Sequence, residues 1–284
     1  MSKTIRATIH VVVWIVGISG LILFFTNIRN IGDWWYLKSY TPPPAIQDLA
    51  TQAHMTSAGR DVFYRSAPQI VSRRSDIVKY CALTDNQVAE LGCYVSNNHI
   101  YLLDIQDPAL KNEMIVTAAY EMLHPVYEHM DTSTRNLIDK EIEKIAPTIT
   151  DPSILSQIQI YADTEPDSRD EELYSILGTE YPHISTVLEA NYALYLADRT
   201  GLVSYHLAFE QVYTNLSDQI TQLDGQIKSI KANMQAYRQS GQINQYNTLV
   251  AQVNSLVDMY NADVVQYNKY GQDLFGQESV SSSP

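Results

Sequence analysis

The chain has 284 residues, of which 45% are hydrophobic, 10% aromatic and 18% charged, and its formal net charge is −13. This composition excludes a disordered or collagen-like chain and supplies enough apolar material for one sizeable core. The 32 acidic side chains outnumber the 19 basic ones, which argues against nucleic-acid binding because that function needs a basic surface. Two cysteines are too few for a disulfide-dense scaffold or a zinc site of four cysteines.

The N-terminal region predicts a membrane anchor. Residues 11–25 contain no charge, and apolar neighbours extend the segment to residues 9–28, which is long enough for a helix that crosses a bilayer. No small-residue cleavage site follows, so we expect an uncleaved, single-pass anchor rather than a signal peptide. Lys3 and Arg6 precede it, which favours a cytoplasmic N-terminus (residues 1–8) and an extracytoplasmic body in the cell membrane.

A spacer and a short body are expected after the anchor. Residues 29–59 contain three consecutive prolines and a helical stretch, and the body begins at residue 60. Short strands are predicted at residues 61–64 and 69–71. A clearer β-hairpin follows at residues 92–95 and 99–105, where Cys, Tyr, Val and Ile flank a Ser-Asn-Asn turn.

The C-terminal region predicts a helical arm. Apolar and aromatic residues recur in alternating steps of three and four over residues 209–237 and 243–267, on either side of a glycine turn. Two such helices predict an antiparallel coiled-coil hairpin over residues 206–270, and the polar residues 271–284 predict a disordered tail. The expected fold class is therefore mainly α with a small β-sheet (α+β).

One predicted helix carries the chemically informative residues. The frame Tyr120-Glu121-Met122-Leu123-His124 resembles the H-E-x-x-H helix of zinc peptidases, in which two histidines bind the metal and the glutamate activates its water. Glu121 stands at the general-base position and His124 at the second ligand position, but Tyr120 replaces the first ligand. In zincins a hairpin strand and a short loop precede the metal-binding helix, and the same order is predicted here. The strand of a zincin lies along the cleft and can pair with an extended peptide substrate. We expect that strand at residues 100–105.

Further segments occur in series with this frame. They are Gly92-Cys93-Tyr94, Ile100-Tyr101-Leu102-Leu103-Asp104, Asp107-Pro108, Val116-Thr117-Ala118-Ala119, Glu172-Leu173-Tyr174-Ser175-Ile176-Leu177-Gly178-Thr179-Glu180 and Leu188-Glu189-Ala190-Asn191-Tyr192-Ala193. Together they resemble a family of uncharacterised, membrane-anchored, zincin-like zinc metallopeptidases of bacteria. The resemblance covers about residues 60–205 and implies a zincin-like body.

The resemblance also implies where a zinc site would lie. In that family a histidine occupies the position of Tyr120, and further histidines occupy the positions of Tyr174 and Asn191, which are therefore former-site candidates. Acidic groups remain at Glu172 and Glu180 as candidates for the third ligand, and Glu180 is the preferred one.

Two departures from the family pattern weaken the zinc site. Tyr120 is a poor ligand because a phenol with a pKa near 10 must lose its proton to coordinate well. Pro125 follows His124 directly and predicts a kink in the helix at the motif. We therefore expect no cofactor, with zinc as the cofactor only if the site is active.

The two cysteines allow two interpretations. Cys81 and Cys93 can form a disulfide if the body is extracytoplasmic, whereas two reduced, buried thiols are the alternative.

Three functions remain compatible with these patterns. The first is a membrane-anchored, extracytoplasmic pseudo-metallopeptidase that binds peptides or protein segments, or scaffolds an envelope complex, without zinc-dependent hydrolysis. The second is an active zinc metalloprotease with unusual ligation, in which Glu121 is the general base and Tyr120, His124 and Glu180 are candidate ligands. The third is a membrane-tethered coiled-coil adaptor. The expected partners are the lipid bilayer, through residues 9–28, and a protein or peptide, but no nucleic acid.

Overall fold

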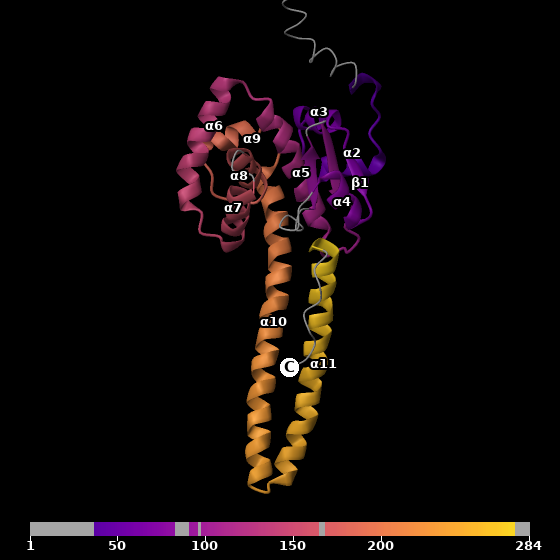
Figure 1. The fold of residues 1–284 in the computed structure, drawn as a ribbon, viewed down its shortest axis with the longest axis vertical. Helices are drawn as coiled ribbons and strands as arrows, with labels where there is room; N and C mark the ends of the chain where they lie inside the picture. The colour runs from indigo at the N-terminus through magenta and orange to yellow at the C-terminus, as the bar shows by residue number, and fades with distance from the viewer. Residues whose placement is uncertain (1–36, 83–90, 96–97, 165–167, 276–284) are drawn as a thin grey trace, which may run out of the picture. The chain divides into compact units, whose positions relative to one another are not determined.

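The computed structural model describes residues 37–82, 91–95, 98–164 and 168–275. The chain divides into two compact units, and the unit that begins at Pro44 contains all the elements considered below (Figure 1). The predicted anchor and the cytoplasmic segment before it lie outside the described residues. Within the described part of the chain, no helix is both long enough and apolar enough to cross a membrane.

The fold is mainly helical with one small sheet, as the sequence predicts. The helices are α2 (Pro44–Gln52), α3 (Ser57–Arg65), α4 (Arg74–Tyr80), α5 (Lys111–Glu128), α6 (Thr132–Ile145), the 3₁₀-helix η2 (Ala146–Thr148), α7 (Pro152–Thr164), α8 (Arg169–Thr179), α9 (Thr186–Tyr192), α10 (Arg199–Gln239) and α11 (Ile243–Phe275). The strands are β1 (Gln69–Val71), β2 (Gly92–Val95) and β3 (His99–Leu103).

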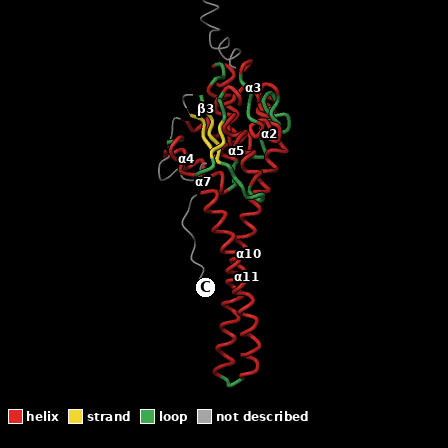
Figure 2. The backbone as a smooth tube through the Cα atoms, turned by 90° about the vertical axis from the view of Figure 1, so that its right-hand side faces the viewer, coloured by secondary structure: helices red, strands yellow, loops and turns green. Residues whose placement is uncertain are grey.

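The sheet has the order β1-β3-β2. Figure 2 shows its strands in yellow, with β3 labelled. β2 and β3 pair in antiparallel fashion, which confirms the predicted hairpin, and β1 pairs with β3 in parallel. The prediction that β3 borders a substrate cleft is wrong, because β3 is the central strand and pairs on both sides. The edge strand is β2.

The segment 61–64 is helical, which corrects the predicted strand. It belongs to α3, whose first turn is capped by the Thr56 side chain as it accepts a hydrogen bond from the Gly59 N–H. Phe63 is fully buried on the face of this helix that meets the core. The β-branched and aromatic residues suggested a strand, but the cap and the tertiary burial favour the helix.

Helix α5 forms the centre of the body. Fifteen of its 18 residues are buried, and helices α2, α3, α8 and α10 and strands β2 and β3 pack around it. The helix continues through Pro125 to Glu128, so the proline does not end it. Because α2 packs on α5, the segment that was expected to be a spacer contributes Ile46, Leu49 and Ala50 to the core.

Helices α10 and α11 lie side by side and leave the body as an antiparallel pair (Figure 1). Leu223 and Ile227 pack against Tyr260 and Val264, all at positions of the predicted apolar seam. Helix α10 begins at Arg199, earlier than residue 206, and its first turns are buried in the body. The predicted disordered tail is wrong for residues 271–275, which belong to α11; the remaining tail lies outside the described residues.

Two helical glycines have opposite surroundings and give a paired test of the packing. A Cβ atom at Gly178 of α8 would stand 2.9 Å from Tyr192 Cε1 and collide with Leu123, whereas a Cβ at Gly225 of α10 meets nothing within 4 Å. We expect Gly178→Ala to lower the free energy of unfolding by about 1–3 kcal/mol through overpacking. Gly225→Ala should raise it by about 0.5–1 kcal/mol, because alanine is the better helix former.

Urea denaturation followed by circular dichroism at 222 nm measures both changes. The two variants control each other, since each replaces a helical glycine with alanine. A stabilised Gly178→Ala chain would contradict the close packing of α8 on α5 and α9.

Candidate functional site

A cavity of about 630 Å³ lies between α5, β2, α7, α8 and the first turns of α10. No lysine or arginine is among its lining residues, all of which are described. Its carboxylate and imidazole groups come from six glutamates and two histidines: Glu113, Glu121, His124, Glu171, Glu172, Glu180, His206 and Glu210. The cavity is therefore strongly acidic.

One face of α5 supplies three of these eight groups. Glu113, Thr117, Tyr120, Glu121 and His124 all line the cavity, and their spacing of three to four residues places them along one side of the helix. This face is polar although the helix is buried, so its side chains depend on neighbouring elements for hydrogen-bond partners.

The Tyr120 cluster consists of Tyr120, Glu121, His124, Glu171 and Glu172. The Tyr120 hydroxyl donates a hydrogen bond of 2.5 Å to Glu172 Oε2. His124 Nδ1 lies 3.0 Å from Glu171 Oε1, and His124 Nε2 lies 3.8 Å from both Glu121 Oε2 and Glu172 Oε2. The backbone N–H of Tyr94 in β2 donates to the Glu121 carboxylate. Each carboxylate of this cluster thus has a partner.

Burial and mutual charge shift the protonation of the Tyr120 cluster. Burial raises the pKa of Tyr120 well above 10, and the neighbouring Glu172 carboxylate adds to this effect. Burial opposes the charge on His124, but Glu172, Glu171 and Glu121 outweigh it and raise the pKa of the imidazole to about 10. Burial raises the pKa of Glu121 to about 7, although His124 partly offsets this.

The His206 cluster consists of Glu113, Glu180, His206 and Glu210. His206 Nδ1 lies 3.5 Å from Glu113 Oε2, and His206 Nε2 lies 3.8 Å from Glu180 Oε2 and 3.7 Å from Glu210 Oε1. Glu180 also accepts a hydrogen bond of 3.2 Å from the Gln157 side chain. His206 is only 4% exposed, yet neither ring nitrogen has a hydrogen-bond partner.

The carboxylates also perturb the pKa values of the His206 cluster. Burial raises the pKa of Glu180 to about 7, and the nearby His206 offsets part of this rise. Burial opposes the charge on His206, but Glu113 and Glu180 outweigh it and raise the pKa of the imidazole to about 9.

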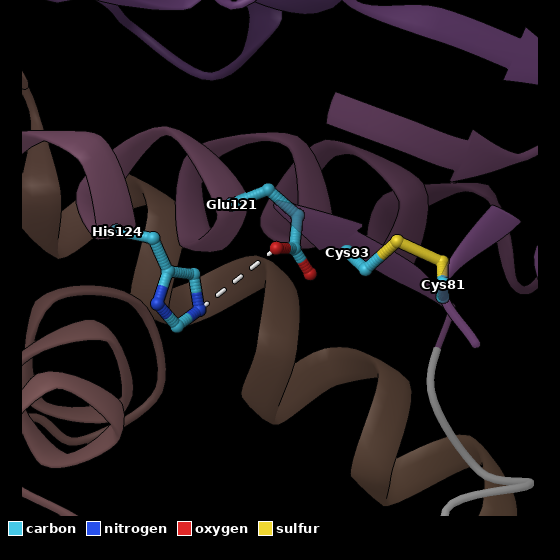
Figure 3. The surroundings of a disulfide bond; sticks show 4 residues. All are labelled: Cys81, Cys93, Glu121 and His124. Carbon is cyan, nitrogen blue, oxygen red and sulfur yellow. Dashed lines mark ion pairs between the residues drawn. A yellow bond between two sulfur atoms is a disulfide. The ribbon is translucent and has the colours of Figure 1, made fainter. Parts of the chain in front are cut away.

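A disulfide lies beside the Tyr120 cluster. Cys81, at the C-terminal end of α4, is bonded to Cys93 of β2 with a Cα–Cα distance of 5.8 Å. Figure 3 shows Cys93 on the strand next to Glu121 and His124 of α5. Both cysteines line the cavity, so the bond ties the wall formed by β2 to α4.

The structure brings together some of the residues that the sequence singles out and separates others. Tyr120, Glu121, His124 and Glu172 meet in the Tyr120 cluster. Glu180, the preferred third ligand in the sequence, faces His206 instead, because it lies two helical turns beyond Glu172.

The two former-site candidates do not line the cavity. The Tyr174 hydroxyl donates a hydrogen bond of 2.6 Å to Asn191 Oδ1, and the Tyr174 ring packs between Tyr127 and Tyr192 in the core. These two positions therefore stabilise the contact between α8 and α9.

The residues of the Tyr120 cluster do not fit a zinc ion. Zinc coordination by Tyr120 needs a phenolate, but this hydroxyl keeps its proton and donates a hydrogen bond to Glu172. Zinc coordination by His124 needs a neutral imidazole with a free nitrogen, whereas three carboxylates surround this ring and favour the imidazolium. Within the described residues, no three His, Cys, Asp or Glu side chains are placed so that they could hold a metal ion.

The sequence analysis missed Glu113, Glu171, His206 and Glu210. Two signals were present: Glu113 lies eight residues before Glu121 on the same helix face, and His206 and Glu210 form an i,i+4 pair. Because the apolar pattern begins at residue 209, the sequence analysis placed His206 and Glu210 in the arm and not in the body.

Comparison of the chain with protein-family models, with curated proteins and with solved structures finds no match.

The protonation of His124 predicts a pH dependence of stability. In the unfolded chain this imidazole has a pKa near 6.5, against about 10 in the folded chain. Its stabilising proton is therefore fully bound below pH 6.5 in both states, and the stabilisation is lost as the pH rises toward 10. We expect the difference in unfolding free energy between wild type and His124→Gln to narrow from pH 6.5 to pH 10.

Urea denaturation at several pH values, with chelator present, measures this difference. His183→Gln, which removes an exposed imidazole outside the cavity, controls for the general effect of losing a histidine. A difference that stays constant or widens with pH would contradict the charged state of His124.

Proposed function

We propose that this chain binds an extended peptide or protein segment in the acidic cavity, by strand addition to β2, and does not hydrolyse it with zinc. The observation that carries this proposal is that the edge strand of the sheet forms a wall of the cavity. An edge strand presents unpaired backbone groups, which an extended segment can satisfy.

The register of the hairpin identifies these groups. Leu103 N–H donates a 2.8 Å hydrogen bond to the Leu91 carbonyl, so by alternation Cys93 and Val95 also direct their backbone groups toward β3. Gly92 and Tyr94 then direct theirs away from the sheet and toward the cavity. Since Glu121 accepts from the Tyr94 N–H, a bound segment would use the two backbone groups of Gly92.

The remaining parts of the proposal concern where the protein acts. We place a single-pass anchor at residues 9–28, with residues after it on the extracytoplasmic side of the cell membrane. The disulfide between Cys81 and Cys93 supports this side, because disulfides persist mainly in oxidising compartments. The pair α10–α11, as an antiparallel coiled coil, would connect the body to an envelope partner, and its apolar seam supports that role.

One observation favours a second function, an active zinc metalloprotease with a zincin-like body. The structure brings Tyr120, Glu121, His124 and Glu172 to one wall of the cavity, next to the edge strand β2. The protonation of Tyr120 and the carboxylates around His124 speak against this function in the wild-type chain. A single substitution separates the two.

We expect Tyr120→His to create a zinc site that the wild-type chain lacks. The new side chain would lie one helical turn from His124, with Glu172 beside both, which completes a set of three protein ligands. After chelator dialysis, exposure to ZnCl₂ and desalting, elemental mass spectrometry should find about one zinc per chain in the variant and far less in wild type.

Tyr120→Phe is the matched control, because it removes the hydroxyl without adding a ligand, and it should acquire no zinc. Stoichiometric zinc in wild type that is lost in His124→Gln would overturn the proposal and favour the metalloprotease. No zinc in Tyr120→His would show that the wall has lost the ligand geometry as well as the first ligand.

Strand addition predicts that the effect of N-methylation on the affinity of a bound peptide alternates along the peptide. Only every second residue of the peptide directs its amide toward β2, so N-methylation of one alternate set of amides should weaken binding by about tenfold or more. N-methylation of the other set should leave affinity nearly unchanged. Fluorescence polarisation with labelled ten-residue peptides from a synthetic library, selected for binding to the full chain, measures both.

Equal effects of the two sets, or no effect of either, would contradict strand addition. The failure of every library peptide to bind would contradict peptide binding itself.

A further inference from the structure

The His206 end of the cavity is a built site with unsatisfied polar atoms. Glu113, Glu180 and His206 are 8%, 6% and 4% exposed, and they come from α5, the end of α8 and α10. Glu113 Oε2 and both ring nitrogens of His206 are buried and make no hydrogen bond of good geometry, and their contacts are the ion pairs of 3.5–3.8 Å within the cluster. Such atoms cost free energy unless a ligand pairs with them.

The two clusters of the cavity differ in this respect. In the Tyr120 cluster each carboxylate has a close partner. Glu121 accepts a hydrogen bond from the Tyr94 backbone, and Glu172 accepts one from the Tyr120 hydroxyl. Glu171 lies against the His124 ring. In the His206 cluster Glu180 accepts a hydrogen bond from Gln157, whereas Glu113 and Glu210 contact His206 at ion-pair distances of 3.5 and 3.7 Å. The His206 cluster therefore has acceptors in excess and needs a donor-rich ligand.

Charge gives the sign of that ligand. Three carboxylates lie within 3.5–3.8 Å of the His206 ring, and the lining of the cavity contains no lysine or arginine. One imidazolium cannot balance three carboxylates, so a ligand with a positive charge would be attracted to this end.

The positions of the carboxylates indicate the shape of the ligand. Glu113 approaches the Nδ1 side of the His206 ring, whereas Glu180 and Glu210 approach the Nε2 side. A planar guanidinium, with five N–H donors in a fixed fork, can stack on the ring and reach both sides at once. A single metal ion would contact one nitrogen of the ring and leave the opposite carboxylate unused.

We propose that the His206 cluster binds the guanidinium group of an arginine side chain in the segment that occupies the cavity. This inference rests on the proposed function and names the chemistry of its ligand. Phe209 lines the same wall and offers an apolar surface for the aliphatic part of that arginine. Glu210, with its side chain 25% exposed, stands where the arginine would enter.

Small arginine derivatives test binding to the His206 cluster separately from strand addition to β2. Isothermal titration of the full chain compares Nα-acetyl-arginine amide with Nα-acetyl-citrulline amide, which has the same shape but no charge. We expect the arginine amide to bind at least about tenfold more tightly, and Glu210→Gln to weaken it by about tenfold, because a charge-assisted hydrogen bond is lost.

Asp218→Asn is the matched control. It removes the same charge from an exposed position on the same helix, two turns beyond Glu210 and outside the cavity, and it should leave the affinity for the arginine amide unchanged. An equal loss in Asp218→Asn would show a general effect of net charge and overturn the specific site.

Four further outcomes are decisive. Equal binding of the arginine and citrulline amides would overturn the inference, as would an unchanged affinity in Glu210→Gln. Stoichiometric binding of ZnCl₂ or MnCl₂ that is lost in Glu210→Gln and competes with the arginine amide would replace it with a divalent-cation site. A library peptide that binds equally well with citrulline in place of arginine would leave strand addition standing and refute this inference alone.

Discussion

The burial of α5 is the constraint on which the rest of the structure depends. Fifteen of its 18 residues are buried, and the buried set includes Glu113, Glu121 and His124. Isolated charges cannot be buried without partners, so the elements around α5 must carry complementary groups. Helix α8 supplies Glu171 and Glu172, α10 supplies His206, and β2 supplies a backbone N–H. The polar face of one helix thus decides which elements surround the cavity.

These partners satisfy α5 unevenly, and the difference separates two kinds of chemistry in one cavity. At the Tyr120 end, a phenol, an imidazole and a backbone N–H contact the three carboxylates, so that each carboxylate has a partner. At the His206 end, three carboxylates share one imidazole and buried atoms stay unpaired. A closed network stabilises the fold, whereas an open one leaves polar groups for a ligand to satisfy. The residues that look most catalytic in the sequence are therefore the ones that are already paired with one another within the wall.

The sequence predicts the elements of this protein better than their mutual placement. Periodicity and turn residues identify the β2–β3 hairpin and the seam of α10 and α11, because these patterns are local. They do not reveal which strand lies at the sheet edge, since strand order depends on β1 pairing with β3 from the other side. Glu172 and Glu180 lie on or next to the same helix, and only tertiary packing shows that Glu172 faces Tyr120 while Glu180 faces His206.

Helix α10 lines the cavity with its first turns and forms half of the arm with the rest, so the arm is connected directly to the cavity wall. Its first turn is fixed by Arg199, a buried side chain that pairs with Glu189 and donates to the Leu177 and Tyr181 carbonyls. At the other end of the hairpin, Arg74 donates to the Leu274 carbonyl of α11. An arm tied to the body at both of its ends cannot turn about a single linker. Since His206 lies on α10 only two turns beyond Arg199, a displacement of the arm would also move a wall of the cavity, and a ligand in the cavity would resist it.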